Sequence, residues 1–131
     1  MSEKRFQEGL ERRKRVLGEA HVARAMDQAP EFTRDFQDFM TEYVWGGVWS
    51  AGGITSLRER SLIVTSILCA LGKGHEMRLH MRGALRNGVT PEELKSVIYH
   101  ILGYCGAPAA LECFRAYAEA KAAFDAEQAA K

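Results

Sequence analysis

The stretch of sequence that decides the fold is residues 74–93, GHEMRLHMRGALRNGVTPEE. Its helical first part runs into Asn87-Gly88, a pair typical of a helix C-terminus. Thr90-Pro91-Glu92-Glu93 then supplies an N-capping hydroxyl, a proline suited to the first helical position and a capping-box glutamate. The stretch therefore predicts one helix over about 74–87 and a second helix that starts at Pro91.

The rest of the chain also has helical periodicity, and no segment alternates with the period of a strand. The third helix is expected to bury an aromatic face. Helix 57–72 is the most apolar, and we expect it to form the core together with helices 74–87 and 91–104. These patterns predict an all-α fold of six or seven helices in one domain, residues 1–131. The helices expected besides these three are 3–17, 20–28, a third beginning near Pro30, and a last one beginning near Pro108.

Composition excludes several classes of protein. A net charge of +1 argues against a nucleic-acid binder that relies on charge. Every window of 18 residues contains charge, which argues against a transmembrane helix, and the N-terminus lacks the apolar region of a secretory signal. The three cysteines have no C-x-x-C spacing. We therefore expect a cytoplasmic protein whose partners are small molecules or copies of itself, with no membrane or nucleic acid involved.

Glu76 and His80 form the most informative pair of side chains. Residues four apart on a helix lie within roughly 40° of each other around the axis, so the two side chains can touch. A carboxylate beside an imidazole favours the protonated ring and suits proton transfer. From the spacing alone, a solvated helical pair or a satisfied core histidine remains an alternative.

The histidines and arginines of helix 74–87 suggest two further kinds of site, a metal site and an anion site. His75 and His80 are five residues apart and point about 140° from each other, so they do not match a zinc motif, and no metal is expected. Arg78, Arg82 and Arg86 form a ridge well away from the Glu76/His80 edge, which suggests a solvated or inter-subunit face.

Three further features lie near an irregular segment. Residues 50–56, SAGGITS, are too rich in glycine and serine for a helix and predict a mobile loop over a site. Arg58 and Arg60 follow this loop and can meet a carboxylate, although surface charge is an equal alternative. Trp45 and Trp49 precede it and can either pack in a core or line a pocket.

Taken together, these motifs resemble the 4-carboxymuconolactone decarboxylase family of the alkylhydroperoxidase-D-like superfamily. The resemblance covers roughly residues 5–118 and depends on five motifs in order. They are Trp45-Gly46-x-x-Trp49, Arg60-Ser61-Leu62, Glu76-x-Arg78-Leu79-His80-x-Arg82, Asn87-Gly88-Val89-Thr90-Pro91-Glu92-Glu93 and Tyr104-Cys105-Gly106-x-Pro108-Ala109-Ala110.

The resemblance implies a cofactor-free carboxy-lyase of all-helical fold that assembles as a homo-oligomer, a hexamer. Its activity would be decarboxylation of 4-carboxymuconolactone to β-ketoadipate enol-lactone in protocatechuate catabolism. His80 and Glu76 would then be catalytic, with either one as the direct proton donor. The substrate-binding residues would be Arg60, Arg58, Trp45, Trp49 and Tyr104.

The chain also departs from its superfamily and its family. Peroxidase members of the superfamily carry C-x-x-C-x-x-x-H, and Lys73 and Glu76 stand at the two cysteine positions here, which argues against thiol peroxidase activity. Ala51-Gly52-Gly53 replaces a usual Arg-Pro-Gly turn, and Leu111 replaces a usual asparagine. These changes leave the acid/base pair but alter the expected pocket. A paralogue acting on another small lactone or oxo acid, or a non-catalytic oligomeric scaffold, therefore remains an alternative.

Overall fold

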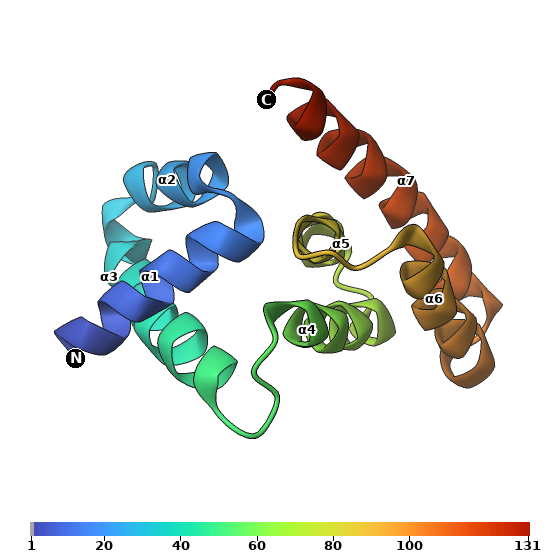
Figure 1. Ribbon diagram of the computed structural model, residues 1–131, viewed down its shortest axis with the longest axis horizontal. Helices are drawn as coiled ribbons and strands as arrows, with labels where there is room; N and C mark the ends of the chain where they lie inside the picture. Colours follow the sequence, from blue (N-terminus) through green and yellow to red (C-terminus); the bar gives the residue numbers. More distant parts are fainter. Residues whose placement is uncertain (1) are drawn as a thin grey trace. The chain divides into compact units, whose positions relative to one another are not determined.

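The structure, a computed structural model, describes residues 2–131 and contains helices and no strand in that range. The prediction of an all-α fold is confirmed, with seven α-helices in the described chain (Figure 1). A π-helix, η1, and a short 3₁₀ helix, η2, follow the third α-helix. The elements are α1 (Glu3–Leu17), α2 (Glu19–Asp27), α3 (Glu31–Met40), η1 (Thr41–Gly47), η2 (Val48–Ser50), α4 (Leu57–Leu71), α5 (Gly74–Arg86), α6 (Pro91–Cys105) and α7 (Ala107–Ala129).

The helices form two compact units, which divide after Thr55. The N-terminal unit holds α1 to η2 and the C-terminal unit holds α4 to α7. The irregular segment expected at 50–56 is observed from Ala51 to Ser56 and contains the division between the two units. The single domain expected from the sequence stays a prediction.

In the N-terminal unit, α3 differs from expectation. Its aromatic stripe is exposed within this chain, so the prediction of a buried aromatic face is wrong here. The periodicity correctly identified one face of the helix, but α1 and α2 pack elsewhere on α3 and η1. The exposed fractions are 94% for Phe32, 59% for Phe36, 58% for Phe39 and 57% for Tyr43.

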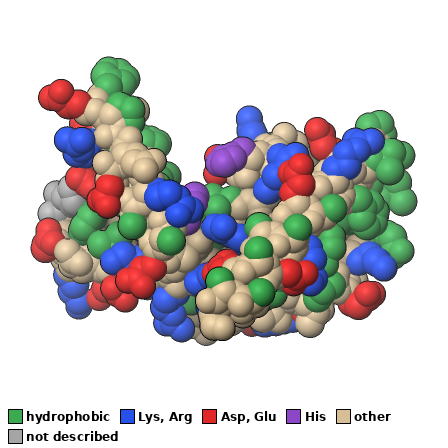
Figure 2. Space-filling model, turned by 90° about the horizontal axis from the view of Figure 1, so that it is seen from above, with side chains coloured by type: hydrophobic (Ala, Val, Ile, Leu, Met, Phe, Trp, Pro, Cys, Tyr) green, Lys and Arg blue, Asp and Glu red, His purple; other side chains and the backbone are tan. Residues whose placement is uncertain are grey.

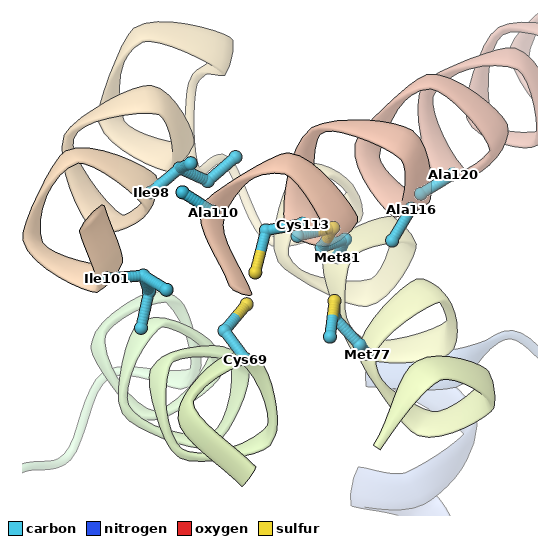
Figure 3. Packing of buried hydrophobic residues seen from close by; sticks show 9 residues of the cluster. All are labelled: Cys69, Met77, Met81, Ile98, Ile101, Ala110, Cys113, Ala116 and Ala120. Carbon is cyan, nitrogen blue, oxygen red and sulfur yellow. The ribbon is translucent and has the colours of Figure 1, made fainter. Parts of the chain in front are cut away.

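The C-terminal unit has an apolar core to which all four of its helices contribute. Met77 and Met81 of α5 and Ile98 of α6 are almost completely buried in it (Figure 3). The sequence predicted a core of α4, α5 and α6, whereas α7 contributes four small side chains as well. These are Ala110, Cys113, Ala116 and Ala120.

Two cysteines meet inside this core. Cys69 of α4 and Cys113 of α7 are buried free thiols, and their sulfur atoms point toward one another (Figure 3). Burial, followed by the neighbouring Cys113, raises the pKa of Cys69 above its ordinary value. Because the thiolate is the reactive form, these buried thiols act as small apolar side chains that fill the core.

Helix α7 also covers the arginine ridge of α5. Arg78 forms an ion pair with Glu119, and Arg86 forms one with Glu127. The ridge was expected to be solvated or to face another subunit. Arg78 and Arg86 instead join α5 to α7, which extends to Ala129.

The boundary between α5 and α6 forms as predicted. Thr90 caps α6 by accepting a hydrogen bond from the backbone N–H of Glu93 (3.1 Å), and the Glu93 carboxylate accepts one from the N–H of Thr90 (2.9 Å). Gly88 adopts φ +92°, which supplies the left-handed turn after α5.

The surface carries hydrophobic side chains among charged ones, as the face shown in Figure 2 illustrates. None of the helices in residues 2–131 is long and apolar enough to cross a membrane. The cytoplasmic location stays a prediction.

Candidate active site

Helix α5 carries the Glu76/His80 pair, and its start is set by the end of α4. Gly72 takes a left-handed conformation (φ +70°) and its N–H bonds to the carbonyl of Cys69, which ends α4. Helix α5 then begins two residues later, at Gly74. Glu76 therefore lies in the first turn, where the helix dipole favours a negative charge.

The two members of the pair differ in exposure. Glu76 is exposed, whereas His80, one turn later on the same face, is only 9% exposed. Met77 and Met81, each beside one of them in sequence, face the apolar core and fix the rotation of α5. The arrangement places a carboxylate in contact with solvent next to an imidazole that is largely shielded from it.

Helix α4 holds the backbone at His80 in place. The buried hydroxyl of Thr65 donates a hydrogen bond to the His80 carbonyl (3.3 Å). Near the end of α5, the Asn87 amide donates to the buried hydroxyl of Ser61 (2.9 Å). The sequence did not predict these contacts of Thr65 and Ser61 with α5. Ser61, Thr65 and Cys69 are small side chains four residues apart on α4, so they lie on one face of that helix. This spacing is the sequence signal that could have predicted a close approach of α5 to α4.

Arg58 and Arg60 lie in the first turns of α4, which Ser56 caps by accepting a hydrogen bond from the N–H of Glu59 (3.2 Å). Arg58 forms an ion pair with the capping-box residue Glu93 of α6. The Arg58 guanidinium, followed by the N–H of Thr90, lowers the pKa of Glu93 from 4.5 to about 2. Arg58 is therefore engaged in the contact between α4 and α6, and Arg60, two residues later in sequence, is half-buried.

Tyr104 lies near the C-terminal end of α6 and is 88% exposed. Glu93, the partner of Arg58, lies near the other end of the same helix. Eleven residues of α-helix separate them, which is roughly 16 Å along the axis. The C-terminal unit therefore does not bring Tyr104 and Arg58 together.

Trp45 and Trp49 belong to the N-terminal unit and form a stacked pair. Their ring centroids are 4.6 Å apart with an interplanar angle of 21°. The side chains are 4% and 5% exposed, respectively. The structure thus joins the two tryptophans into one buried aromatic pair, on the segment that changes from π to 3₁₀ geometry.

A metal centre was not expected from the sequence. Within residues 2–131, no group of three His, Cys, Asp or Glu side chains is arranged to hold a metal ion. The chemical groups that the C-terminal unit offers are a carboxylate, an imidazole and guanidinium groups, which move protons and bind anions.

Comparison with known proteins places these residues in a family context. A 4-carboxymuconolactone decarboxylase from Acinetobacter baylyi is 45% identical over 107 residues, which are 82% of this chain and 79% of that protein. A nitrosuccinic acid decarboxylase from Metarhizium robertsii is 39% identical over 107 residues, which are 82% of this chain and 74% of that protein. The sequence model of the Carboxymuconolactone decarboxylase family matches residues 34–119, which include η1, the Glu76/His80 pair and the start of α7. The chain belongs to the carboxymuconolactone decarboxylase family.

Proposed function

We propose that this protein is a carboxy-lyase that converts 4-carboxymuconolactone to β-ketoadipate enol-lactone and CO₂ in protocatechuate catabolism. The observation that carries the proposal is the 45% identity to a 4-carboxymuconolactone decarboxylase over 82% of this chain. The role of each residue is argued from its position and chemistry.

The substrate itself can hold the electrons released by decarboxylation. When the carbon–carbon bond to the carboxylate breaks, its electron pair moves into the conjugated lactone carbonyl and CO₂ departs. A proton must then reach the ring carbon beside that carbonyl. The protein needs to bind the substrate carboxylate, stabilise the developing oxyanion and deliver this proton, and none of these steps requires a cofactor.

His80 and Glu76 are the proposed proton-transfer pair. The low exposure of His80 supports its role at the reacting carbon, where water must be limited. The exposed carboxylate of Glu76 can exchange protons with solvent and orient or charge the imidazole one turn away. Transfer from His80 with Glu76 as relay is the order that this difference in exposure favours.

Arg60 is the proposed ligand of the substrate carboxylate, with a lesser role for Arg58, which pairs with Glu93. Trp45 and Trp49 would provide an apolar wall, and Tyr104 would contribute a further wall. The exposure of Tyr104 suits a wall contributed to a site completed by another subunit.

We also propose a homo-oligomer, specifically a hexamer, as the active form. Exposed apolar side chains on α3, α4 and α6 support association, because such surfaces are uncommon on monomers when they form patches. Light scattering coupled to size exclusion would give a mass six times 14.6 kDa. A monomer at micromolar concentration would contradict this part of the proposal.

Nitrosuccinic acid is a second candidate substrate, favoured by the 39% identity to a nitrosuccinic acid decarboxylase. A nitro group next to the departing carboxylate can take up the electron pair, as the lactone carbonyl does. The protonation step is then the same, so one acid/base pair could serve either substrate. The altered loop at Ala51-Gly52-Gly53 is where the two pockets are expected to differ.

The test is CO₂ release from each compound by purified protein, with a chelator and without added metal. We expect turnover of the lactone to exceed that of nitrosuccinic acid, and Arg60→Gln to raise KM at least about 10-fold. The reverse preference would select the second candidate. Turnover of neither compound by intact oligomer would favour a non-catalytic scaffold.

A further inference from the structure

The π-helix η1 that carries Trp45 is held in place by α1. We propose that Arg12 and Arg13 of α1 are positioning residues for the Trp45–Trp49 pair. This inference rests on the proposed function in one respect, namely that the tryptophans form a wall of the substrate site.

The position of the tryptophans depends on a short piece of unusual backbone. Trp45 belongs to η1 and Trp49 to η2, so the stacked pair spans the change from π to 3₁₀ geometry. A π-helix is wider than an α-helix and is stable only in short stretches that their surroundings support. Any loss of support that lets residues 41–50 return to α-helix would rotate the two indoles relative to each other.

Arg12 provides support at the tryptophan itself. Its guanidinium donates a hydrogen bond to the backbone carbonyl of Trp45. This contact joins α1 directly to the residue whose side chain forms half of the stacked pair. It also satisfies a carbonyl in a helix with non-standard hydrogen bonding.

Arg13 provides support where α3 changes into η1. Arg13 is 4% exposed, and its guanidinium donates to the Thr41 hydroxyl (3.0 Å) and to the side-chain carbonyl of Gln37 (2.9 Å). The Thr41 hydroxyl donates in turn to the backbone carbonyl of Gln37 (2.7 Å). The Arg13 guanidinium also lies 3.3 Å from the sulfur atom of Met26.

These contacts of Arg13 are all with neutral groups, and burial lowers the pKa of Arg13. Burying a cation in this way costs stability compared with an apolar side chain of the same size. The benefit of arginine here is directional, because its planar fork of donors fixes the relative positions of the atoms that it binds.

The backbones of α1 and η1 also touch. A Cβ added to Gly9 would lie 2.7 Å from the nitrogen of Gly46, and one added to Gly46 would lie 2.7 Å from Cγ of Arg5. Near the start of α1, Arg5 and the N–H of Ser2 reach Glu42 at 3.9 and 3.1 Å. Helix α1 therefore contacts η1 along its length, and the two arginines add the hydrogen bonds that set its backbone.

The chain offers a clean spectroscopic test, because Trp45 and Trp49 are its only tryptophans. Two indoles stacked this closely give an exciton couplet in circular dichroism. We expect Arg12→Met and Arg13→Met, which both remove the donors, each to reduce the couplet by at least about half and to raise KM about 10-fold with little change in kcat. Arg12→Lys retains a donor and should restore most of the signal. Arg15→Ala, on the exposed side of α1, is the matched control and should resemble the unchanged protein.

A purely stabilising role predicts a different result. The variants would then melt at lower temperature but, while folded, keep the wild-type couplet and KM, and the proposal would be overturned. Because Arg13 is buried, Arg13→Met can fail to fold, in which case Arg12→Met decides, since Arg12 is only half-buried. The couplet needs no substrate, so it tests the positioning even if the protein does not turn over the lactone.

Discussion

The contacts that hold η1 in the N-terminal unit are largely polar, whereas the core cluster around α5 in the C-terminal unit is apolar. In residues 2–55, a buried guanidinium, a hydroxyl and two closely approaching glycines join α1 to α3 and η1. In residues 56–131, methionine, isoleucine, alanine and cysteine side chains fill the space between four helices. Directional hydrogen bonds fix one backbone conformation, whereas apolar packing fixes the rotation and spacing of whole helices.

These two kinds of contact match the candidate site residues that each unit carries. The tryptophan pair depends on an unusual local backbone, which needs specific donors at specific carbonyls. The Glu76/His80 pair needs only a regular helix in the right rotation, which Met77 and Met81 set by burial. Substitutions in the two units should therefore have effects of different size and kind.

The largest effect on stability is expected from a cavity in the C-terminal core. Ile98 is 1% exposed, so Ile98→Ala should lower the free energy of unfolding by about 2–5 kcal/mol. Lys95→Ala, on the exposed side of the same helix, should change it by about 0.5 kcal/mol or less. Urea denaturation would measure both, and equal losses would contradict the assignment of this core.

Glycine-to-alanine substitutions should change stability in opposite directions in the two units. Gly9→Ala places a methyl group against the backbone of η1 and should destabilise the protein by about 1–3 kcal/mol. Gly103→Ala, in α6, meets no atom within 4 Å and should stabilise it by about 0.4–1 kcal/mol. Thermal melts of the two variants provide the comparison. A neutral Gly9→Ala would show that α1 and η1 are not in close contact.

The smallest effect concerns the ion pair between α4 and α6. The pKa of Glu93 is depressed from 4.5 to about 2, so the contribution of its charge is present above about pH 4.5 and is lost as the pH falls toward 2. Glu93→Gln keeps an acceptor for the capping box but removes this charge. The difference in unfolding free energy between wild type and Glu93→Gln should therefore shrink between about pH 6 and about pH 2.5. A constant difference would contradict the pairing with Arg58.

Much of this architecture could be predicted from local signals. The capping box at Thr90 and Glu93 and the left-handed glycine at 88 act within a few residues, so the sequence alone located the boundary between α5 and α6. The ion pairs of Arg78 and Arg86 with α7 could not be found in this way. They depend on which helix covers the ridge, and that is a property of tertiary packing.

The same distinction between local signals and tertiary packing applies to the candidate site. The order of motifs identified the family, and helical spacing placed Glu76 and His80 on one face. The role of Arg12 and Arg13 could not be anticipated, because the π-helix they support has no sequence signature comparable to a capping box. The pairing of Arg58 with Glu93 was equally hidden, since it joins residues 35 positions apart.

The central claim is that His80, assisted by Glu76, delivers the proton that completes decarboxylation. The most direct test is the turnover of 4-carboxymuconolactone by His80→Ala, in protein whose far-ultraviolet circular dichroism and oligomer mass match the wild type. We predict a fall in kcat of at least about 100-fold, in the range expected for removal of a general acid. Turnover at the wild-type rate would contradict the account.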